Sequence, residues 1–371
     1  MRNGRTRLWF NRRETKGARR LHRIYGHERL LNRLAASLTT GRFPNATLFV
    51  GPKGVGKQRV ALWAAQGILC DAGPGAPCGR CHSCHQADSL SHPDLHWFIP
   101  VTRPRATEPD KQVEEVRALL GEAVAQRRAS TLYGRPEGTA SHPLASIRLL
   151  QRIAYVHPFQ GPRKVVVLGN AERLVVQEAS QEAANALLKI LEEPPADTYL
   201  ILTTSEPQAL LPTIRSRLVP VRVGTVSDAA VRDFLRNEVK PAPSAAALEQ
   251  RVMKAEGSIG RAAFGTGSED AASGAAERFL VAVQDGPRRW APLALAQAPW
   301  AARGDFTAML DALALRLRAG LMKRAARDPR ASSRIAAAVR QVEETRAAAQ
   351  GNVNPQVALA VLALRLGRLV A

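Results

Sequence analysis

The sequence reads Gly51-Pro52-Lys53-Gly54-Val55-Gly56-Lys57 directly after a short apolar run, Thr47 to Val50. A second run with helical spacing, Val60 to Ala65, follows it. A buried strand, a glycine-rich loop with a lysine, and a helix form the layout of a phosphate-binding loop, in which backbone N–H groups and the helix N-terminus hold phosphates. We therefore expect this stretch and Gln58 to bind a nucleotide, with Lys57 reaching its outer phosphates. The alternative is a glycine turn that only packs a helix against a sheet.

All four cysteines of the chain lie within one short window: Cys70, Cys78, Cys81 and Cys84. Paired Cys-x-x-Cys steps let thiolates converge on a tetrahedral Zn²⁺, and four sulfurs leave no open position, so the sequence predicts a structural zinc. The first gap, residues 71–77, is rich in glycine and proline and can fold back toward the metal. Disulfides are the competing interpretation, which an intracellular ATPase-like chain disfavours.

Length and charge limit the classes of protein to consider. A chain of 371 residues predicts two or three domains. The formal net charge of +21 favours an anionic partner such as nucleic acid. No apolar run is long enough to span a bilayer, and the arginine-rich N-terminus, 1–22, has too short an apolar cluster for a signal peptide. We expect a cytoplasmic protein with no membrane partner, whose basic tail is a disordered extension rather than a DNA-binding arm.

Strands and helices alternate over the first two hundred residues after the tail. Further apolar runs that read as strands are Leu95 to Ile99, Lys164 to Leu168, Tyr199 to Leu202 and Val219 to Val223. Continuous apolar strands separated by amphipathic helices indicate a doubly wound α/β domain with a parallel sheet, at 23–224. The polar segment 102–143 reads as an insertion with a helix at Val113 to Ala125, and the sequence does not indicate its role.

Strands disappear after this domain. Short helical patterns occupy 225–265, and the Gly/Ser/acid-rich stretch 266–274 reads as a linker. Leucines at helical spacing then recur in 275–371, which predicts an all-helical domain whose apolar stripes form core or partner-facing surface.

Further motifs accompany the phosphate loop and the cysteines: His92-Pro93-Asp94-Leu95, Ala184 to Lys189, Leu191-Glu192-Glu193-Pro194-Pro195 and Leu211 to Arg217. In this combination the chain resembles the gamma/tau/delta-prime group of bacterial DNA polymerase III clamp-loader subunits, within the AAA+ family. The His-Pro-Asp step is similar to that of the delta-prime members. The resemblance implies an AAA+ core with a zinc knuckle at 70–84, a helical lid at 225–265 and a helical collar at 275–371.

The resemblance also implies partners and a role. Collars of the family assemble gamma/tau, delta and delta-prime subunits into a hetero-pentamer that loads the sliding clamp onto primed DNA. Arg217 matches the family's arginine finger, which enters the ATP site of the neighbouring subunit, and Thr204 or Thr203 matches the position that senses the terminal phosphate. A guanidinium there neutralises charge on the transferred phosphoryl group. The alternative for Arg217 is a solvated loop arginine.

Three departures from an active ATPase lie on the Mg²⁺ and water side of the nucleotide. Gln58 stands where Ser or Thr ligates Mg²⁺, and Gly169-Asn170 stands where acidic residues follow the strand. Gly260 stands where motor subunits of the family carry a sensing arginine, and Arg261 is the next residue. We expect ATP or ADP to bind weakly or structurally, without appreciable hydrolysis, and the catalytic contribution to be Arg217 in trans.

Two other functions remain open at this stage. One is an ATP-hydrolysing gamma/tau-type motor subunit, which the missing hydroxyl and acids disfavour. The other is a stand-alone zinc-containing nucleic-acid-binding protein, which explains the charge but leaves Arg217 and the helical domain without a purpose. The sequence shows no carboxylate constellation of a polymerase or nuclease. The resemblance thus implies a subunit of the DNA-directed DNA polymerase III holoenzyme that has no polymerase site of its own.

Overall fold

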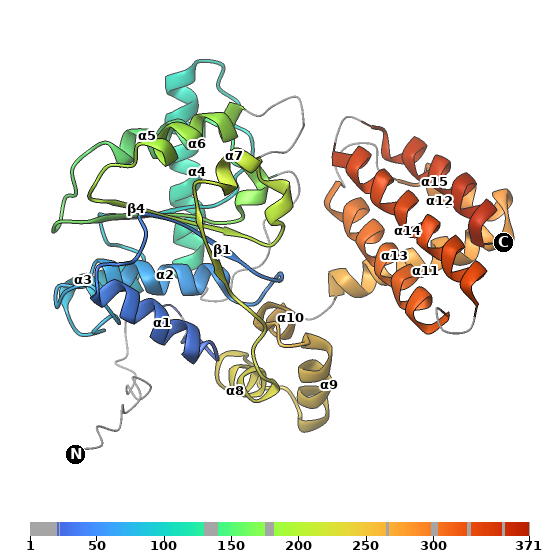
Figure 1. Cartoon of the computed structure of the whole chain (residues 1–371), viewed down its shortest axis with the longest axis horizontal. Helices are drawn as coiled ribbons and strands as arrows, with labels where there is room; N and C mark the ends of the chain where they lie inside the picture. Colours follow the sequence, from blue (N-terminus) through green and yellow to red (C-terminus); the bar gives the residue numbers. More distant parts are fainter. Residues whose placement is uncertain are drawn as a thin grey trace.

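A parallel five-stranded sheet forms the centre of the N-terminal domain in the computed structural model (Figure 1), which describes residues 21, 23–129, 140–174, 182–264, 267–297, 303–324, 328–350 and 353–370. The strands run in the order β2-β3-β4-β1-β5. Their bounds are β1 Ala46–Val50, β2 Leu95–Phe98, β3 Lys164–Leu168, β4 Thr198–Thr204 and β5 Val219–Arg222. Every residue of β3 is buried, as expected for a strand that is covered on both faces.

Helices cover both faces of the sheet, so the predicted α/β domain is confirmed (Figure 1). One face carries α1 Glu28–Thr39, α2 Lys57–Ile68 and α3 His82–Asp88. The other carries α5 Leu144–Ala154, α6 Glu182–Glu192 and the short α7 Pro212–Arg215, while α4 Pro109–Ala129 packs along α5. The 3₁₀ turns are η1 Ala171–Leu174 and η2 Pro207–Ala209.

The strand order places three loops side by side. Strand β1 pairs with β4 and β5, and β4 also pairs with β3. The loops that follow β1, β3 and β4 therefore leave the same end of neighbouring parallel strands. In open α/β sheets this edge is where ligands bind, and it carries the phosphate loop.

A small three-helix domain follows the sheet. Its helices are α8 Asp228–Glu238, α9 Ala245–Ala255 and α10 Ile259–Phe264. Ser227 and Ser244 cap the first two by accepting hydrogen bonds from the N–H groups of Ala230 and Ala247. Val231, Phe234 and other buried residues give this domain a core of its own, against which Tyr25 packs from the N-terminal side.

The C-terminal domain is all helical, as predicted. Its helices are α11 Gly267–Asp285, α12 Pro287–Leu295, α13 Arg303–Arg324, α14 Pro329–Gln350 and α15 Pro355–Val370. Its core is separate from that of the sheet and contains Phe279, Leu310, Leu313 and Leu362. In the described part of the chain, no helix is both long and apolar enough to span a membrane.

The prediction of a linker at 266–274 is wrong, because α11 begins at Gly267. The physical reason is burial at helical spacing: Ala272, Ala276, Phe279 and Val283 are all buried, and this stripe stabilises the helix despite its glycine and serine content. The segment 102–143 contains α4 where a helix was expected. The basic tail at 1–22 lies, apart from Leu21, outside the described residues.

Candidate functional site

The phosphate loop joins β1 to α2, as the sequence predicts. Gly54 and Gly56 have φ angles of 79° and 95°, which glycine adopts without strain. A side chain at Gly54 would also collide with the small helical domain, because an ideal Cβ there lies 2.4 Å from Ser258 Oγ. The loop thus has the predicted backbone, and its outer side is covered by residues from α10 and the turn before it.

Lys57 does not point into an open phosphate site. Its Nζ donates to the carbonyl oxygens of Gly51 (2.9 Å) and Pro52 (2.8 Å) and to Ser205 Oγ (2.8 Å). An ammonium group has three donors, so these three acceptors use all of them. Burial lowers the pKa of Lys57 to about 8, with Glu172 opposing the shift and Lys53 adding to it. The lysine therefore closes the loop on itself.

The Mg²⁺ side of the site holds an amide pair. Gln58 Nε2 donates to Asn170 Oδ1 at 2.6 Å, and Gln58 lies so close to Gly169 that a Cβ on that residue would be 2.8 Å from its amide carbon. Asn170 N donates in turn to Thr203 Oγ1 (3.2 Å). Hard divalent cations are held by carboxylate, carbonyl and water oxygens, and the amide pair offers no anionic ligand.

The small helical domain is hydrogen-bonded to the loop through α10. Gly260 N donates to Gly54 O at 2.8 Å, and Ser258 Oγ donates to Lys53 O at 3.0 Å. An ideal Cβ on Gly260 would lie 2.8 Å from Gly54 Cα, so only glycine allows this approach. Any side chain at this position, an arginine included, would therefore collide with the phosphate loop. Arg261 pairs with Glu256 on the same domain.

A carboxylate that the sequence analysis missed connects the loop to the C-terminal domain. Glu206, just after β4, pairs with Lys53 Nζ at 2.8 Å and with Arg346 Nη2 of α14 at 3.3 Å. Arg346 also pairs with Asp311 of α13. Burial opposes the ionisation of Glu206, but Lys53 and Arg346 outweigh it and hold the pKa of the carboxylate below its ordinary value. Thr204 Oγ1 accepts the N–H of Glu206 at 3.1 Å, so Thr204 lies beside this cluster.

The four cysteine sulfurs converge. The Sγ atoms of Cys70, Cys78, Cys81 and Cys84 all lie within 4.8 Å of one another, and none of the cysteines forms a disulfide. A donor set of four thiols at such separations fits tetrahedral Zn²⁺. Burial opposes ionisation of Cys78, but the N–H groups of Arg80 and Cys81 outweigh it and lower the pKa of this thiol to about 6, which favours the thiolate that a metal needs.

Neighbouring groups position the cysteines. Asp71 accepts hydrogen bonds from Ser83 N (3.2 Å) and Ser83 Oγ (2.6 Å), and Gln66 Nε2 donates to Cys84 O (2.8 Å). Gly75 N donates to Gly67 O, so the glycine-rich gap folds back onto α2. His82 and His85, which lie beside Cys81 and Cys84 in the sequence, are not part of the cluster.

Arg217 lies at the surface, beyond α7. Its Nη2 donates to Glu192 Oε1 at 2.8 Å and its Nη1 to Thr213 O at 2.9 Å, and 36% of its side chain is exposed. Glu192 belongs to the Leu-Glu-Glu-Pro-Pro motif at the end of α6. The guanidinium is therefore held in a defined orientation at the surface, and the structure does not bring it to the chain's own Lys57.

The model of a protein family described as DNA polymerase III, delta subunit, matches residues 26–227, more than half of the chain. This chain belongs to that family. The match runs from the residues before α1 through the whole sheet to the start of α8. It includes the phosphate loop, the cysteine cluster and Arg217.

Curated relatives agree with this membership. A DNA polymerase III subunit delta' from Pseudomonas aeruginosa is 35% identical over 217 residues, 58% of this chain and 53% of that protein. One from Bacillus subtilis is 29% identical over 57% of this chain and 52% of that protein. A subunit tau from Escherichia coli is 30% identical over 64% of this chain and 31% of that protein. The chain thus spans about half the length, or less, of these relatives.

Among solved structures, a DNA polymerase III gamma subunit-related protein from Thermotoga maritima is similar, with a TM-score of 0.39 and 13% identity over 92% of this chain and 99% of that chain.

Proposed function

We propose that this chain is a clamp-loader subunit that helps load a sliding clamp onto primed DNA, binds no Mg²⁺–ATP productively itself, and supplies Arg217 to the ATP site of a neighbouring subunit. Family membership supports the general role. The observation that carries the finer role is the amide pair of Gln58 and Asn170 at 2.6 Å, which replaces the Mg²⁺ ligands of an ATPase. A cytoplasmic location follows from this role.

The geometry of the loop supports the absence of hydrolysis. Phosphoryl transfer needs Mg²⁺ on a hydroxyl and a carboxylate, and a group that orients the attacking water. Gln58 and Asn170 supply amides at these places, and the neighbouring carboxylate of Glu172 accepts a hydrogen bond from Asn170 Nδ2 at 3.3 Å. ATP or ADP would also have to displace the three hydrogen bonds of Lys57 and separate Lys53 from Glu206. Weak nucleotide binding without turnover is the outcome that these contacts favour.

The environment of Arg217 supports a role in trans. A guanidinium remains charged at every physiological pH, and its planar fork fits phosphate oxygens. On the surface of this chain it is partly exposed and oriented by Glu192, so a phosphate on a neighbouring subunit can compete for it. An ion pair at an exposed surface contributes only about 1 kcal/mol or less, so exchanging Glu192 for a phosphate has a low cost.

Two exposed apolar surfaces support protein partners. On α15, the side chains of Val357, Val361 and Leu364 are exposed at helical spacing, and we assign this face to the collar contact with other clamp-loader subunits. On the loop after α5, Phe159 is 87% exposed. Asp94 anchors that loop by accepting the N–H groups of Phe159 and Gln160, each at 2.6 Å. We assign this loop to the sliding clamp, and the net charge of +21 to attraction of DNA.

The cysteine cluster is proposed to hold a structural Zn²⁺. Four thiolates would complete its coordination and leave no position for a substrate. The ion would fix the loop 70–81 to α3. Gln160 connects the Phe159 loop to α3, because its Nε2 donates to Ser83 Oγ at 3.0 Å. Its backbone N–H donates to Asp94, which precedes β2. The metal would therefore stabilise the base of the loop assigned to the clamp.

The decisive experiment is reconstitution of a clamp loader with the Arg217→Ala variant. We expect the complex to assemble as with the wild type, while DNA-dependent ATP turnover and clamp loading fall by roughly 10³-fold or more. Arg222→Ala, which removes a nearby exposed arginine, is the matched control and should load normally. Robust ATP turnover by the isolated wild-type chain, abolished by Lys57→Ala, would contradict the proposal and identify a motor subunit.

A further inference from the structure

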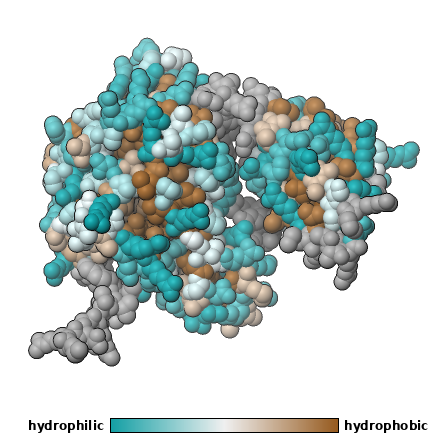
Figure 2. All heavy atoms as spheres, viewed as in Figure 1, coloured by the Kyte–Doolittle hydropathy of each residue, from teal (hydrophilic) through white to brown (hydrophobic). Residues whose placement is uncertain are grey.

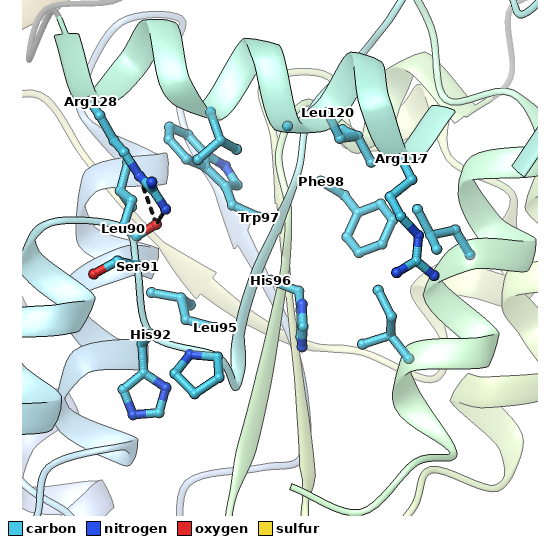
Figure 3. Close-up of a pocket in the computed structure, with 15 residues that line it drawn as sticks. Leu90, Ser91, His92, Leu95, His96, Trp97, Phe98, Arg117, Leu120 and Arg128 are labelled. Atoms are coloured by element: carbon cyan, nitrogen blue, oxygen red, sulfur yellow. Dashed lines mark hydrogen bonds between the residues drawn. The ribbon is translucent and has the colours of Figure 1, made fainter. Parts of the chain in front are cut away.

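A cavity of about 330 Å³ lies between β2, α4 and α5 (Figure 3). Strand β2 is the outermost strand of the sheet on this side, and α4 is the helix of the insertion whose role the sequence left unassigned. The volume falls at the lower end of the range of small-molecule pockets, roughly 300–1,000 Å³. The insertion thus forms one wall of a pocket that no part of the proposed clamp-loading role uses.

The walls of this cavity are apolar, with a one-sided set of charges. Trp97 and Phe98 of β2, Leu120 of α4 and Leu149 of α5 line it and are themselves buried. Two arginines and two histidines also line it: Arg117, Arg128, His92 and His96. No Asp or Glu is among the lining residues described. An apolar cavity with basic groups and no acid is complementary to an anion that has an apolar body.

Two of these basic groups have no partner among the residues that the structure describes. Arg128 donates to Leu90 O, and His92 Nδ1 accepts the N–H of Asp94. By contrast, the side chains of Arg117 and His96 form no hydrogen bond or ion pair within the described ranges. In Figure 3 the guanidinium of Arg117 extends down from α4 on the side of the strand where His96 lies. A ligand can therefore use both groups without displacing an existing bond.

The surrounding charges favour an anion. Burial is the largest of the causes that together lower the pKa of His96 to about 4. Lys164, Arg117 and His92 act in the same direction as burial, and Asp94 opposes them. The one acid in this group, Asp94, is already bound to two backbone N–H groups of the Phe159 loop. At neutral pH His96 is thus an uncharged imidazole with an N–H to donate, and the exposed guanidinium of Arg117 lines the same cavity.

We propose that this cavity binds a small organic anion, a carboxylate or phosphate monoester with a compact apolar body, whose anionic group lies between Arg117 and His96. The apolar body packs against Phe98, which projects from the same side of β2 as His96, and against Leu149 of α5. Charge-assisted hydrogen bonds from the guanidinium provide the specificity for the anion. The inference does not depend on the clamp-loading role, because no residue of the phosphate loop, the cysteine cluster or Arg217 lines the cavity.

The test is calorimetric titration of the full-length chain with three matched probes: 2-naphthoate, 2-naphthyl phosphate and the neutral 2-naphthalenemethanol. We expect one site per chain for at least one anion, and about 10- to 100-fold weaker binding of the neutral probe. The preference between the two anions separates carboxylates from phosphate esters as the ligand class. Failure of both anions to saturate the chain at millimolar concentration would overturn the proposal.

Variants locate the site. Arg117→Gln should weaken anion binding about 10-fold or more, whereas Arg103→Gln, an equal charge change on the same insertion outside the cavity, should leave it unchanged.

Gly121→Leu should block the cavity without unfolding α4, because an ideal Cβ at Gly121 has no atom within 4 Å and leucine favours a helix more than glycine does. Bound anion should also raise the pKa of His96, followed by its NMR resonances. Unchanged anion binding in Arg117→Gln would overturn the assignment.

Discussion

Lys53 and Arg346 bind the same carboxylate. Lys53 belongs to the phosphate loop and Arg346 to α14 of the C-terminal domain, and the two cations contact Oε1 and Oε2 of Glu206 at 2.8 and 3.3 Å. The C-terminal domain lies beside the sheet domain in Figure 1. Figure 2 shows hydrophilic residues along the neighbouring rims of both domains that are visible in this view. Glu206 therefore links the phosphate loop to the C-terminal domain through two ion pairs.

Glu206→Gln should reduce stability by about 1 kcal/mol near neutral pH, because both ion pairs lose their anion. The pKa of Glu206 is lowered in the folded chain, so its contribution is present above the unfolded pKa and is lost as the pH falls through the lower folded value. Urea unfolding at pH 7 and pH 4 should show a smaller pH dependence for the variant. Glu193→Gln, an exposed acid elsewhere, serves as the control; equal pH dependence of wild type and Glu206→Gln would contradict the assignment.

Lys57 gives a second pH signature, of the same sense as that of Glu206 but at alkaline pH. Its pKa is about 8 in the folded chain because of burial, and about 10.4 in an unfolded chain. Between these values the unfolded chain holds a proton that the folded chain has released, so the free energy of unfolding should rise with pH by up to about 3 kcal/mol. In Lys57→Met this rise should be absent. Lys111→Met, at an exposed position of α4, should retain it, and urea unfolding at pH 8 and pH 10 measures the difference.

The sequence predicted what depends on local pattern. The apolar run before Gly51, the glycines of the loop and the Cys-x-x-Cys spacing each specify a short-range geometry, and the structure shows β1, the loop, α2 and converging sulfurs. The inserted helix could be placed for the same reason. We predicted a linker at 266–274 from its glycine and serine content, and this prediction was wrong. The stretch is helical because α11 buries an apolar stripe against other helices of its domain, and the sequence does not show which helices these are.

Contacts between distant segments could not be predicted. Nothing near Lys57 in the sequence shows that Ser205 accepts a hydrogen bond from it, and Glu206 and Arg346 are 140 residues apart. The departures at Gln58, Asn170 and Gly260 were visible as missing catalytic residues. Their positive role, which is to form an amide pair and to pack α10 against the loop, required the geometry.

Metal analysis of two variants should show that the cysteines hold the metal and that the histidines beside them do not. We expect one Zn²⁺ per chain by elemental analysis of the wild type, loss of the metal in Cys84→Ser, and lower stability of that variant by several kcal/mol, because structural zinc contributes directly to folding. His85→Ala should keep a full complement of zinc, since His85 is not in the cluster. A metal-free wild type with intact stability would contradict a zinc site.

Gly260→Ala tests whether the small helical domain holds the phosphate loop. The added Cβ would lie 2.8 Å from Gly54 Cα, so α10 must move away and the hydrogen bond from Gly260 N to Gly54 O must weaken. We expect a loss of about 1–3 kcal/mol in urea unfolding, as for other overpacked sites, together with faster hydrogen exchange at the Gly260 amide. Gly320→Ala on α13 is the control, because an ideal Cβ there has no atom within 4 Å and alanine favours a helix. If Gly260→Ala instead matched the wild type in stability and exchange, the contact between α10 and the loop would have to be looser than the 2.8 Å hydrogen bond indicates.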